Sequence, residues 1–270
     1  GSGGSGGGAS GSAGGSGGSA GGASGGSGGV SGAGGAATLV WRPKAGTTWQ
    51  WQLSGTVDTT VDAQMYDIDL FTNDVSVIRG LHDSGRRVVC YFSAGSYEPD
   101  RPDSAALAAT GLGKVLDGWP DEKWLDIRSP AVRDVMLARL TTAQSKGCDG
   151  VEPDNVDGYD NDNGLGLTMA DQLDYDAFIA TAAHARGLSV GLKNALGLVP
   201  ALVGKFDWAL NEECLKYDEC DALAPFVASA KAVFHCEYAA STAGICDKNP
   251  AGFSTIVKHL SLDAWRLACP

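Results

Sequence analysis

Two segments of this chain place carboxylates in pairs where a strand is expected to end. The first is the segment 148–157, Cys-Asp-Gly-Val-Glu-Pro-Asp-Asn-Val-Asp, and the second ends in Asn211-Glu-Glu-Cys214. Side chains of a strand alternate between its two faces, so Glu152 and Asp154 share one face. Like charges on one face cost stability, which makes a purely structural reason for them weak. Two such strand ends indicate acid/base or nucleophilic chemistry on an uncharged bond, with glycoside hydrolysis as the leading example.

The elements that would position these acids recur along the chain. Short apolar or alternating runs predict eight strands, at 49–53, 63–71, 87–93, 123–127, 150–155, 188–194, 206–212 and 232–238. Apolar residues at helical spacing predict helices at 132–140, 174–186 and 253–267. This alternation predicts an α/β fold, a single (β/α)8 barrel of TIM type, whose catalytic groups lie at the carboxyl ends of the strands. A doubly wound open sheet is the alternative, but no glycine-rich phosphate-binding motif follows any predicted strand.

Polar side chains gather at the predicted carboxyl ends, whereas the strand starts are mostly apolar. They are Gln52, Asp69, Ser93, Asp126, Asp154, Lys193, Glu212 and Glu237. The asymmetry supports both the barrel and an enzymatic role.

The segment 1–37 contains only Gly, Ser and Ala apart from Val30. It buries no apolar surface and predicts a disordered tether, natural or artificial, before one catalytic domain at 38–270. The chain begins without Met or an apolar leader, so we expect any secretory signal to have been removed. No apolar run is long enough for a membrane span, and no membrane insertion is expected.

Seven cysteines predict an oxidising compartment and hence a secreted or surface-tethered, extracellular protein. Close spacing favours the disulfides Cys214–Cys220 and Cys236–Cys246. The remaining Cys90, Cys148 and Cys269 cannot all pair, which leaves at least one free thiol.

The net charge of −12 argues against nucleic acid and anionic membranes as partners and favours a neutral or cationic substrate, although acidity can also serve solubility alone. We expect a monomer without cofactor or metal. The four histidines lack zinc-site spacing, and the acidic segment 157–164 lacks the register of a calcium loop and predicts a turn.

Eight short motifs in order make the chain resemble glycoside hydrolase family 114, whose characterised members are endo-α-1,4-polygalactosaminidases. They are Trp49-Gln-Trp-Gln-Leu53, Tyr66-Asp-Ile-Asp69, Cys90-Tyr-Phe-Ser-Ala-Gly-Ser96, Arg101-Pro-Asp103, Glu122-Lys-Trp-Leu-Asp-Ile127, Glu152-Pro-Asp-Asn-Val-Asp-Gly158, Gly191-Leu-Lys-Asn194 and Asn211-Glu-Glu-Cys214. The resemblance runs from Trp41 to Cys269. It implies a (β/α)8 barrel that hydrolyses α-1,4 linkages in galactosamine-containing polysaccharide. It also implies a catalytic pair of Asp154 with Glu212 or Glu213.

Asp154, next to Asn155 and near Lys193, is the expected nucleophile, and Glu212 the expected acid/base. A retaining enzyme would hold the two carboxyl groups about 5–5.5 Å apart and an inverting one about 6.5–9.5 Å apart, and the sequence leaves both open. Strand parity favours Glu212 over Glu213, because it directs Trp208 and Leu210 into the barrel. Bulges at strand ends keep Glu213 open.

Further residues are candidates for substrate binding. Asp69 is expected either to bind a sugar or to form a buried salt bridge, and Glu152 either to tune Asp154 or to pair with Lys193. About half of the aromatic candidates are expected in the core, since a lone aromatic side chain is more often packing. The full set is Trp51, Asp69, Tyr91, Trp124, Glu152, Asp157, Tyr159, Lys193, Glu213, Glu237 and Tyr238.

Two rival functions stay open. One is a glycosidase for another hexosamine or hexose linkage. The other is a non-catalytic carbohydrate-binding protein, which would gain nothing from holding two acids close together.

Overall fold

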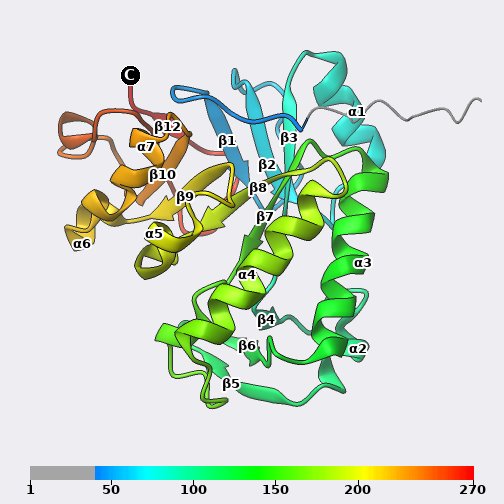
Figure 1. Ribbon diagram of the computed structural model, residues 1–270. Coiled ribbons are helices and arrows are strands. Elements are labelled where there is room, and N and C mark those ends of the chain that lie inside the picture. The colour runs from blue at the N-terminus through cyan, green and yellow to red at the C-terminus, as the bar shows by residue number, and fades with distance from the viewer. Residues whose placement is uncertain (1–39) are drawn as a thin grey trace, which may run out of the picture. The chain divides into compact units, whose positions relative to one another are not determined.

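Eight parallel strands form the curved sheet at the centre of the fold (Figure 1). The computed structural model describes residues 40–270, so the tether predicted at 1–37 lies outside the described residues. The strands, in spatial order, are β1 (Trp49–Gln52), β2 (Met65–Asp69), β3 (Arg87–Ser93), β7 (Gly150–Asp154), β8 (Ser189–Lys193), β9 (Trp208–Glu212), β10 (Val233–Tyr238) and β11 (Phe253–Lys258). This is the TIM-type architecture that the alternation of elements predicts.

The ring is completed by the segment that follows β11. The short β12 (Leu267–Ala268) returns antiparallel to β11. The same return segment lies against β1, because Leu53 N–H donates to Leu262 O (3.0 Å) and the side chain of Gln50 donates to Ala264 O (2.8 Å). The indole N–H of Trp49 also reaches Ser254 O on β11 (2.8 Å).

Helices cover the outside of the sheet. The longer ones are α1 (Val75–Asp83), α3 (Pro130–Lys146) and α4 (Met169–His184), and α3 and α4 lie side by side (Figure 1). Short ones follow later strands: α5 (Val199–Leu202), α6 (Cys214–Tyr217) and α7 (Ala224–Ala228), with 3-10 turns η1 (Gly158–Asp160), η2 (Leu196–Leu198), η3 (Cys220–Leu223) and η4 (Cys246–Lys248). The helices predicted at 132–140 and 174–186 are confirmed. Thr168 and Asp171 form a capping box that starts α4.

Two apolar layers separate along the alternation of the strands. Side chains of one parity meet inside the barrel, including Trp49, Met65, Val89, Trp208, Phe234 and Ile256. Those of the other parity pack under the helices in a larger cluster. Gly191 makes room inside, since a Cβ there would lie 2.3 Å from the ring of Trp208.

Two predicted elements are wrong in type or place. The strand predicted at 123–127 belongs to β6 (Trp119–Leu125), which pairs antiparallel with β4 (Ser96–Tyr97) and β5 (Leu112–Leu116) in a separate sheet. With α2 (Ser104–Ala108), this sheet is an insertion between β3 and α3. The helix predicted at 253–267 is instead the barrel strand β11. A strand buried on both faces gives a continuous apolar run, which also matches helical spacing.

Three disulfides hold the fold. Cys214–Cys220 is as predicted, whereas Cys236–Cys246 is wrong: Cys246 pairs with Cys269, Cys90 pairs with Cys148, and Cys236 is the buried free thiol. Parity explains the error, because Cys236 points into the barrel with Phe234 while Cys246 lies outside it.

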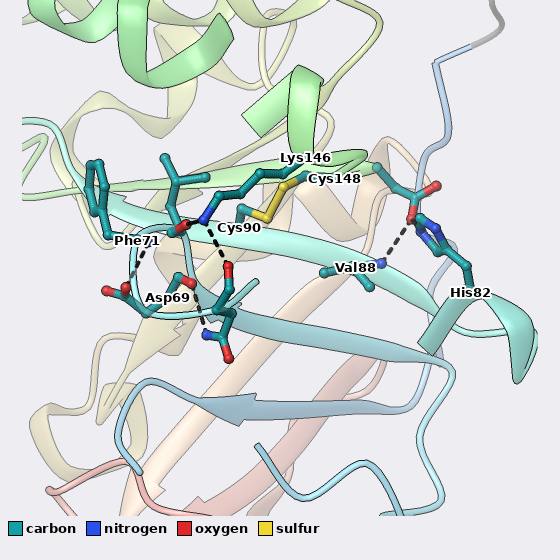
Figure 2. Close-up of a disulfide and its surroundings, with 10 residues drawn as sticks. Asp69, Phe71, His82, Val88, Cys90, Lys146 and Cys148 are labelled. Carbon is teal, nitrogen blue, oxygen red and sulfur yellow. Dashed lines mark hydrogen bonds and ion pairs between the residues drawn. A yellow bond between two sulfur atoms is a disulfide. The ribbon is translucent and has the colours of Figure 1, made fainter. Parts of the chain in front are cut away.

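The bridge Cys90–Cys148 joins β3 to the residues just before β7 (Figure 2). Beside it, the ammonium of Lys146 donates to the carbonyls of Leu70 and Asn73 (both 2.7 Å), which fixes the loop after β2 to the end of α3. Among residues 40–270, no helix is long and apolar enough to span a membrane.

Candidate active site

A cleft of about 760 Å³ opens at the carboxyl ends of the barrel strands. The β5–β6 hairpin of the insertion forms part of one wall, and the loop after β9 contributes Tyr217 and Glu219. Ten of the residues predicted from sequence line this cleft: Trp51, Asp69, Tyr91, Asp154, Asp157, Tyr159, Lys193, Glu212, Glu213 and Tyr238.

Lys193 lies at the centre of the acids. It ends β8 with its side chain inside the barrel and only 3% exposed. Its Nζ lies 2.9 Å from Glu152, 3.1 Å from Asp154 and 3.3 Å from Glu212. An ammonium has three N–H bonds, so one buried cation can serve three carboxylates from two other strands.

Asp154 ends β7 and is held from two further directions. The hydroxyl of Tyr91 donates to its Oδ2 (3.1 Å) and the N–H of Asn155 to its Oδ1 (2.8 Å). Asn155 has a φ of +59°, so the chain turns sharply after the carboxylate. The side chain of Asp154 keeps 20% of its surface exposed, facing the cleft.

Glu212 ends β9 on the other side of Lys193. Its Oε1 accepts from the hydroxyl of Tyr238 and its Oε2 from the amide of Asn194 (3.0 Å). Asn194 also accepts from the backbone N–H of Glu212 (2.9 Å), which fixes the strand end as well as the side chain. Burial, followed by the charge of Glu212, raises the pKa of Tyr238 and keeps that phenol a donor.

Glu213 takes a different course from its neighbour. Its φ of +60° turns the chain away from the strand, and its carboxylate pairs with Lys216 at 2.8 Å. Glu212 has the parity of Trp208 and Leu210, which both pack inside the barrel. The geometry therefore brings Glu212, and not Glu213, to Lys193.

The distance between the two carboxylates is bounded by the shared cation. Asp154 Oδ1 and Glu212 Oε2 each lie within 3.3 Å of Lys193 Nζ. These two oxygens are therefore at most about 6.4 Å apart, and closer where the three atoms do not lie in line, which puts them at or below the lower end of the range for an inverting pair.

A second layer of acids lies beneath the cleft. Glu152 is fully buried, and it accepts from the indole of Trp51 (3.0 Å) and from Lys193. Burial raises the pKa of Glu152, and Lys193 partly offsets the effect. Of the two alternatives for Glu152, pairing with Lys193 is the one observed.

Asp69 takes part in a buried ion pair with Arg101 (2.6 Å), and it also accepts from the N–H groups of Phe71 and Thr72. Arg101 bridges in turn to Glu98 of the insertion. Nearby, Ser96 donates to Glu122 (2.6 Å), and burial raises the pKa of Glu122 to about 6. Burial and Asp154 likewise raise the pKa of Asp157 to about 6. This wall of the cleft is rich in acids, two of which take up protons near pH 6.

Besides the buried Glu152, two predicted binding residues do not line the cleft, Trp124 and Glu237. The ring of Trp124 packs against Gly158, where an added Cβ would come within 3.1 Å. Glu237 has the outward parity on β10 and binds His235 (3.0 Å) and the N–H of Leu215 (2.9 Å). Trp124 thus supports the loop after β7, and Glu237 supports the loop after β9.

Sequence reasoning missed residues that the insertion and loops bring to the cleft: Glu98, Trp119, Glu122, Asn194, Tyr217 and Glu219. Asn194 could have been found, because it directly follows Lys193 in one of the quoted motifs. The insertion residues were hidden by the assignment of 123–127 to the barrel.

In the part of the chain that the structure describes, one group of potential metal ligands is present, Cys214, Cys220 and His235. The two sulfurs are bonded to each other, so this group holds no metal in the oxidised protein.

The chain is similar to known glycoside hydrolases in both sequence and structure. The profile of the glycoside-hydrolase family GH114 matches residues 32–270. The crystal structure of Aspergillus fumigatus Ega3 in complex with galactosamine is 49% identical in sequence, with a TM-score of 0.82, and the match covers 86% of this chain and 98% of Ega3. The glycoside hydrolase domain of PelA from Pseudomonas aeruginosa shares the fold at 15% identity, with a TM-score of 0.66, over 84% of this chain and 99% of that domain. No match was found among curated proteins.

Proposed function

Because this chain belongs to glycoside-hydrolase family GH114, we propose that it is a secreted endo-acting enzyme that cleaves internal α-1,4 linkages of galactosamine-containing polysaccharide. Its similarity to Ega3, whose crystal structure contains galactosamine, supports galactosamine as the sugar of the substrate. The three disulfides favour an oxidising, extracellular location. The protein acts as a monomer without a cofactor.

Asp154 and Glu212 form the catalytic pair. The observation that carries this assignment is the ammonium of Lys193 between the two carboxylates at the floor of the cleft. Asp154 and Glu212 each accept two hydrogen bonds and each contact Lys193, so these contacts favour the charged form of both. We assign Asp154 as the nucleophile and Glu212 as the acid because the longer side chain of Glu212 reaches further toward a leaving oxygen. Glu212 lies at the end of β9, which β8 separates from β7, and it is the acid that protonates the leaving oxygen.

The short separation favours retention of anomeric configuration. Asp154 attacks the anomeric carbon while the glycosidic C–O bond breaks, and Glu212 transfers its proton to the departing oxygen. Glu212 then takes a proton from a water that attacks the glycosyl ester, which frees Asp154. The first product formed would therefore be the α-anomer, observable by NMR before mutarotation.

The acids of the cleft favour a substrate that carries amines. Asp157, Asp160 and Glu219 line the cleft beside the proposed pair, whereas both lining cations, Arg101 and Lys193, are already paired. Protonated amino groups would gain ion pairs there that acetylated ones would not.

The deciding experiment measures reducing ends released from deacetylated and acetylated galactosamine polymers. Asp154→Asn and Glu212→Gln should lose activity by on the order of 10³-fold or more while remaining folded. Glu213→Gln is the matched control. Its activity should fall at most about tenfold, since Glu213 pairs with Lys216 and does not contact Lys193.

Other outcomes separate the rivals. Release from an acetylated or unrelated polymer alone would indicate a glycosidase of different specificity. Binding without any release by the wild type would indicate a carbohydrate-binding protein. Full activity of Glu212→Gln with loss in Glu213→Gln would move the acid to Glu213.

A further inference from the structure

Asp67 is a buried acid that the proposed reaction does not use. It lies on β2, two residues before Asp69, in register with Trp51 of β1 and Val89 of β3, and its side chain faces the barrel interior with no exposed surface. Among residues 40–270, no N–H or hydroxyl group donates to either of its carboxyl oxygens. An ionised carboxylate without a donor or a cation in contact is very costly in such a place.

The carboxyl of Glu152 reaches the same part of the interior, because its Oε2 accepts from the indole of Trp51, which is in register with Asp67. A hydrogen bond between the two carboxyl groups would give Asp67 the partner that it otherwise lacks. Two carboxyl groups can form this bond only if one of them carries a proton. Glu152 accepts from Trp51 and Lys193, which favour its charged form, whereas nothing comparable favours a charge on Asp67. The shared proton therefore belongs on Asp67.

The other charged and titratable groups around the pair agree with this placement. Burial raises the pKa of Asp67 well above its ordinary value, and the charge of Glu152 raises it further. Other titratable and charged groups with inward parity on the barrel strands include Tyr91 of β3, Asp154 of β7, Lys193 of β8, Glu212 of β9, Cys236 and Tyr238 of β10, and Lys258 of β11. Lys193 is already in contact with three acids, and Lys258 donates to Asp263 O.

We propose that Asp67 is a positioning residue that stays protonated and donates a hydrogen bond to Glu152, so that Glu152 remains charged to lower pH and keeps its share of Lys193. The chain of contacts runs from Asp67 through Glu152 and Lys193 to Asp154 and Glu212. Its catalytic consequence rests on the proposed function of that pair.

Two substitutions separate a neutral Asp67 from a charged one. Asp67→Asn keeps a neutral donor and should leave the pH–rate profile in place. Asp67→Leu removes the donor, so Glu152 takes up a proton and Lys193 acts on Asp154 and Glu212 alone. Both limbs of the profile should then move to lower pH, by on the order of one unit. Val89→Ala, in register with Asp67, is the control for packing, and it should change stability without moving either limb.

A direct measurement does not depend on activity. In protein labelled with ¹³C at the aspartate carboxyl, the Asp67 signal should have the shift of a protonated acid from pH 5 to pH 8 and should be absent from Asp67→Asn. A carboxylate shift in this range would overturn the proposal. So would a profile that Asp67→Asn moves as far as Asp67→Leu, because that would mean the substitution removes a charge. If the wild type proves inactive, the proposed function fails, but the NMR signal still decides the state of Asp67.

Discussion

Each of the two proposed catalytic carboxylates accepts a hydrogen bond from one tyrosine. Tyr91 donates to Asp154 and Tyr238 to Glu212, from strands on opposite sides of the pair. A donor to a carboxylate stabilises the ionised form, so loss of the donor favours the protonated form. Under the proposed roles of Asp154 and Glu212, each tyrosine is therefore expected to affect a different limb of the pH–rate profile.

Tyr238→Phe should move the basic limb of kcat/KM to higher pH, because this limb reports loss of the proton from the acid. Activity at the optimum should fall about tenfold as the charge-assisted bond is lost. The measurement is the pH dependence of reducing-end release. A profile that moves only at its acidic limb would assign the nucleophile, and not the acid, to Glu212.

Tyr91→Phe should move the other limb, the acidic one, to higher pH, because loss of the donor favours the protonated nucleophile. The side chain is otherwise unchanged, so the thermal unfolding midpoint should stay close to that of Tyr238→Phe. Equal movement of the same limb in both variants would contradict the separate roles of Asp154 and Glu212.

At the scale of elements, the interior of β8 and β9 depends on one missing side chain. Gly191 faces the ring of Trp208 on the next strand, and a Cβ would approach a ring carbon to 2.3 Å. Two residues further along β8, Lys193 holds the acids. Packing at Gly191 therefore bears on the position of the cation.

Gly191→Ala should destabilise the protein by about 1–3 kcal/mol, as overpacking of a filled core does, and should lower kcat because Lys193 shifts with the strand. Gly204→Ala is a matched control, since nothing lies within 4 Å of a Cβ there. Urea unfolding of both variants gives the comparison. Equal stability of the two variants would mean that the Trp208 ring moves freely.

The predictable part of the fold follows from local pattern. The strands that end at Asp154 and Glu212 are predicted correctly, because strand alternation and strand ends depend on a few consecutive residues. The strand 253–258 is not, because burial on both faces removes the alternation that separates a strand from a helix.

Features that depend on distant partners escaped prediction. The pairing of Cys246 with Cys269 depends on how the segment after β11 folds back, and that of Cys90 with Cys148 on which strands become neighbours. Likewise, Glu237 stands at a strand end as predicted, but its outward parity on β10 was not counted.

For the molecule as a whole, the net charge of −12 falls partly on acids that are costly to ionise in the folded state. Burial raises the pKa of Glu122 and of Asp157 to about 6, well above the values of these groups in an unfolded chain. A folded state that binds more protons than the unfolded state loses stability as pH rises. Asp207, bound to His184 and Arg42, has a lowered pKa, so its contribution to folding stability is lost as pH falls.

Asp157→Asn isolates one of these contributions. The pKa of Asp157 is raised from 3.8 to about 6, so wild-type stability from this group is present below pH 4 and is lost as pH rises through 6. The shift corresponds to up to about 3 kcal/mol. Asn cannot ionise, so the free energy of unfolding of the variant should rise relative to that of the wild type by up to that amount between pH 4 and pH 7.5.

Urea unfolding at both pH values measures this difference. The control is Asp162→Asn, because the side chain of Asp162 is 81% exposed. A stability difference that stays constant with pH would mean that Asp157 ionises as readily in the fold as in the unfolded chain, leaving the acidic wall of the cleft charged throughout.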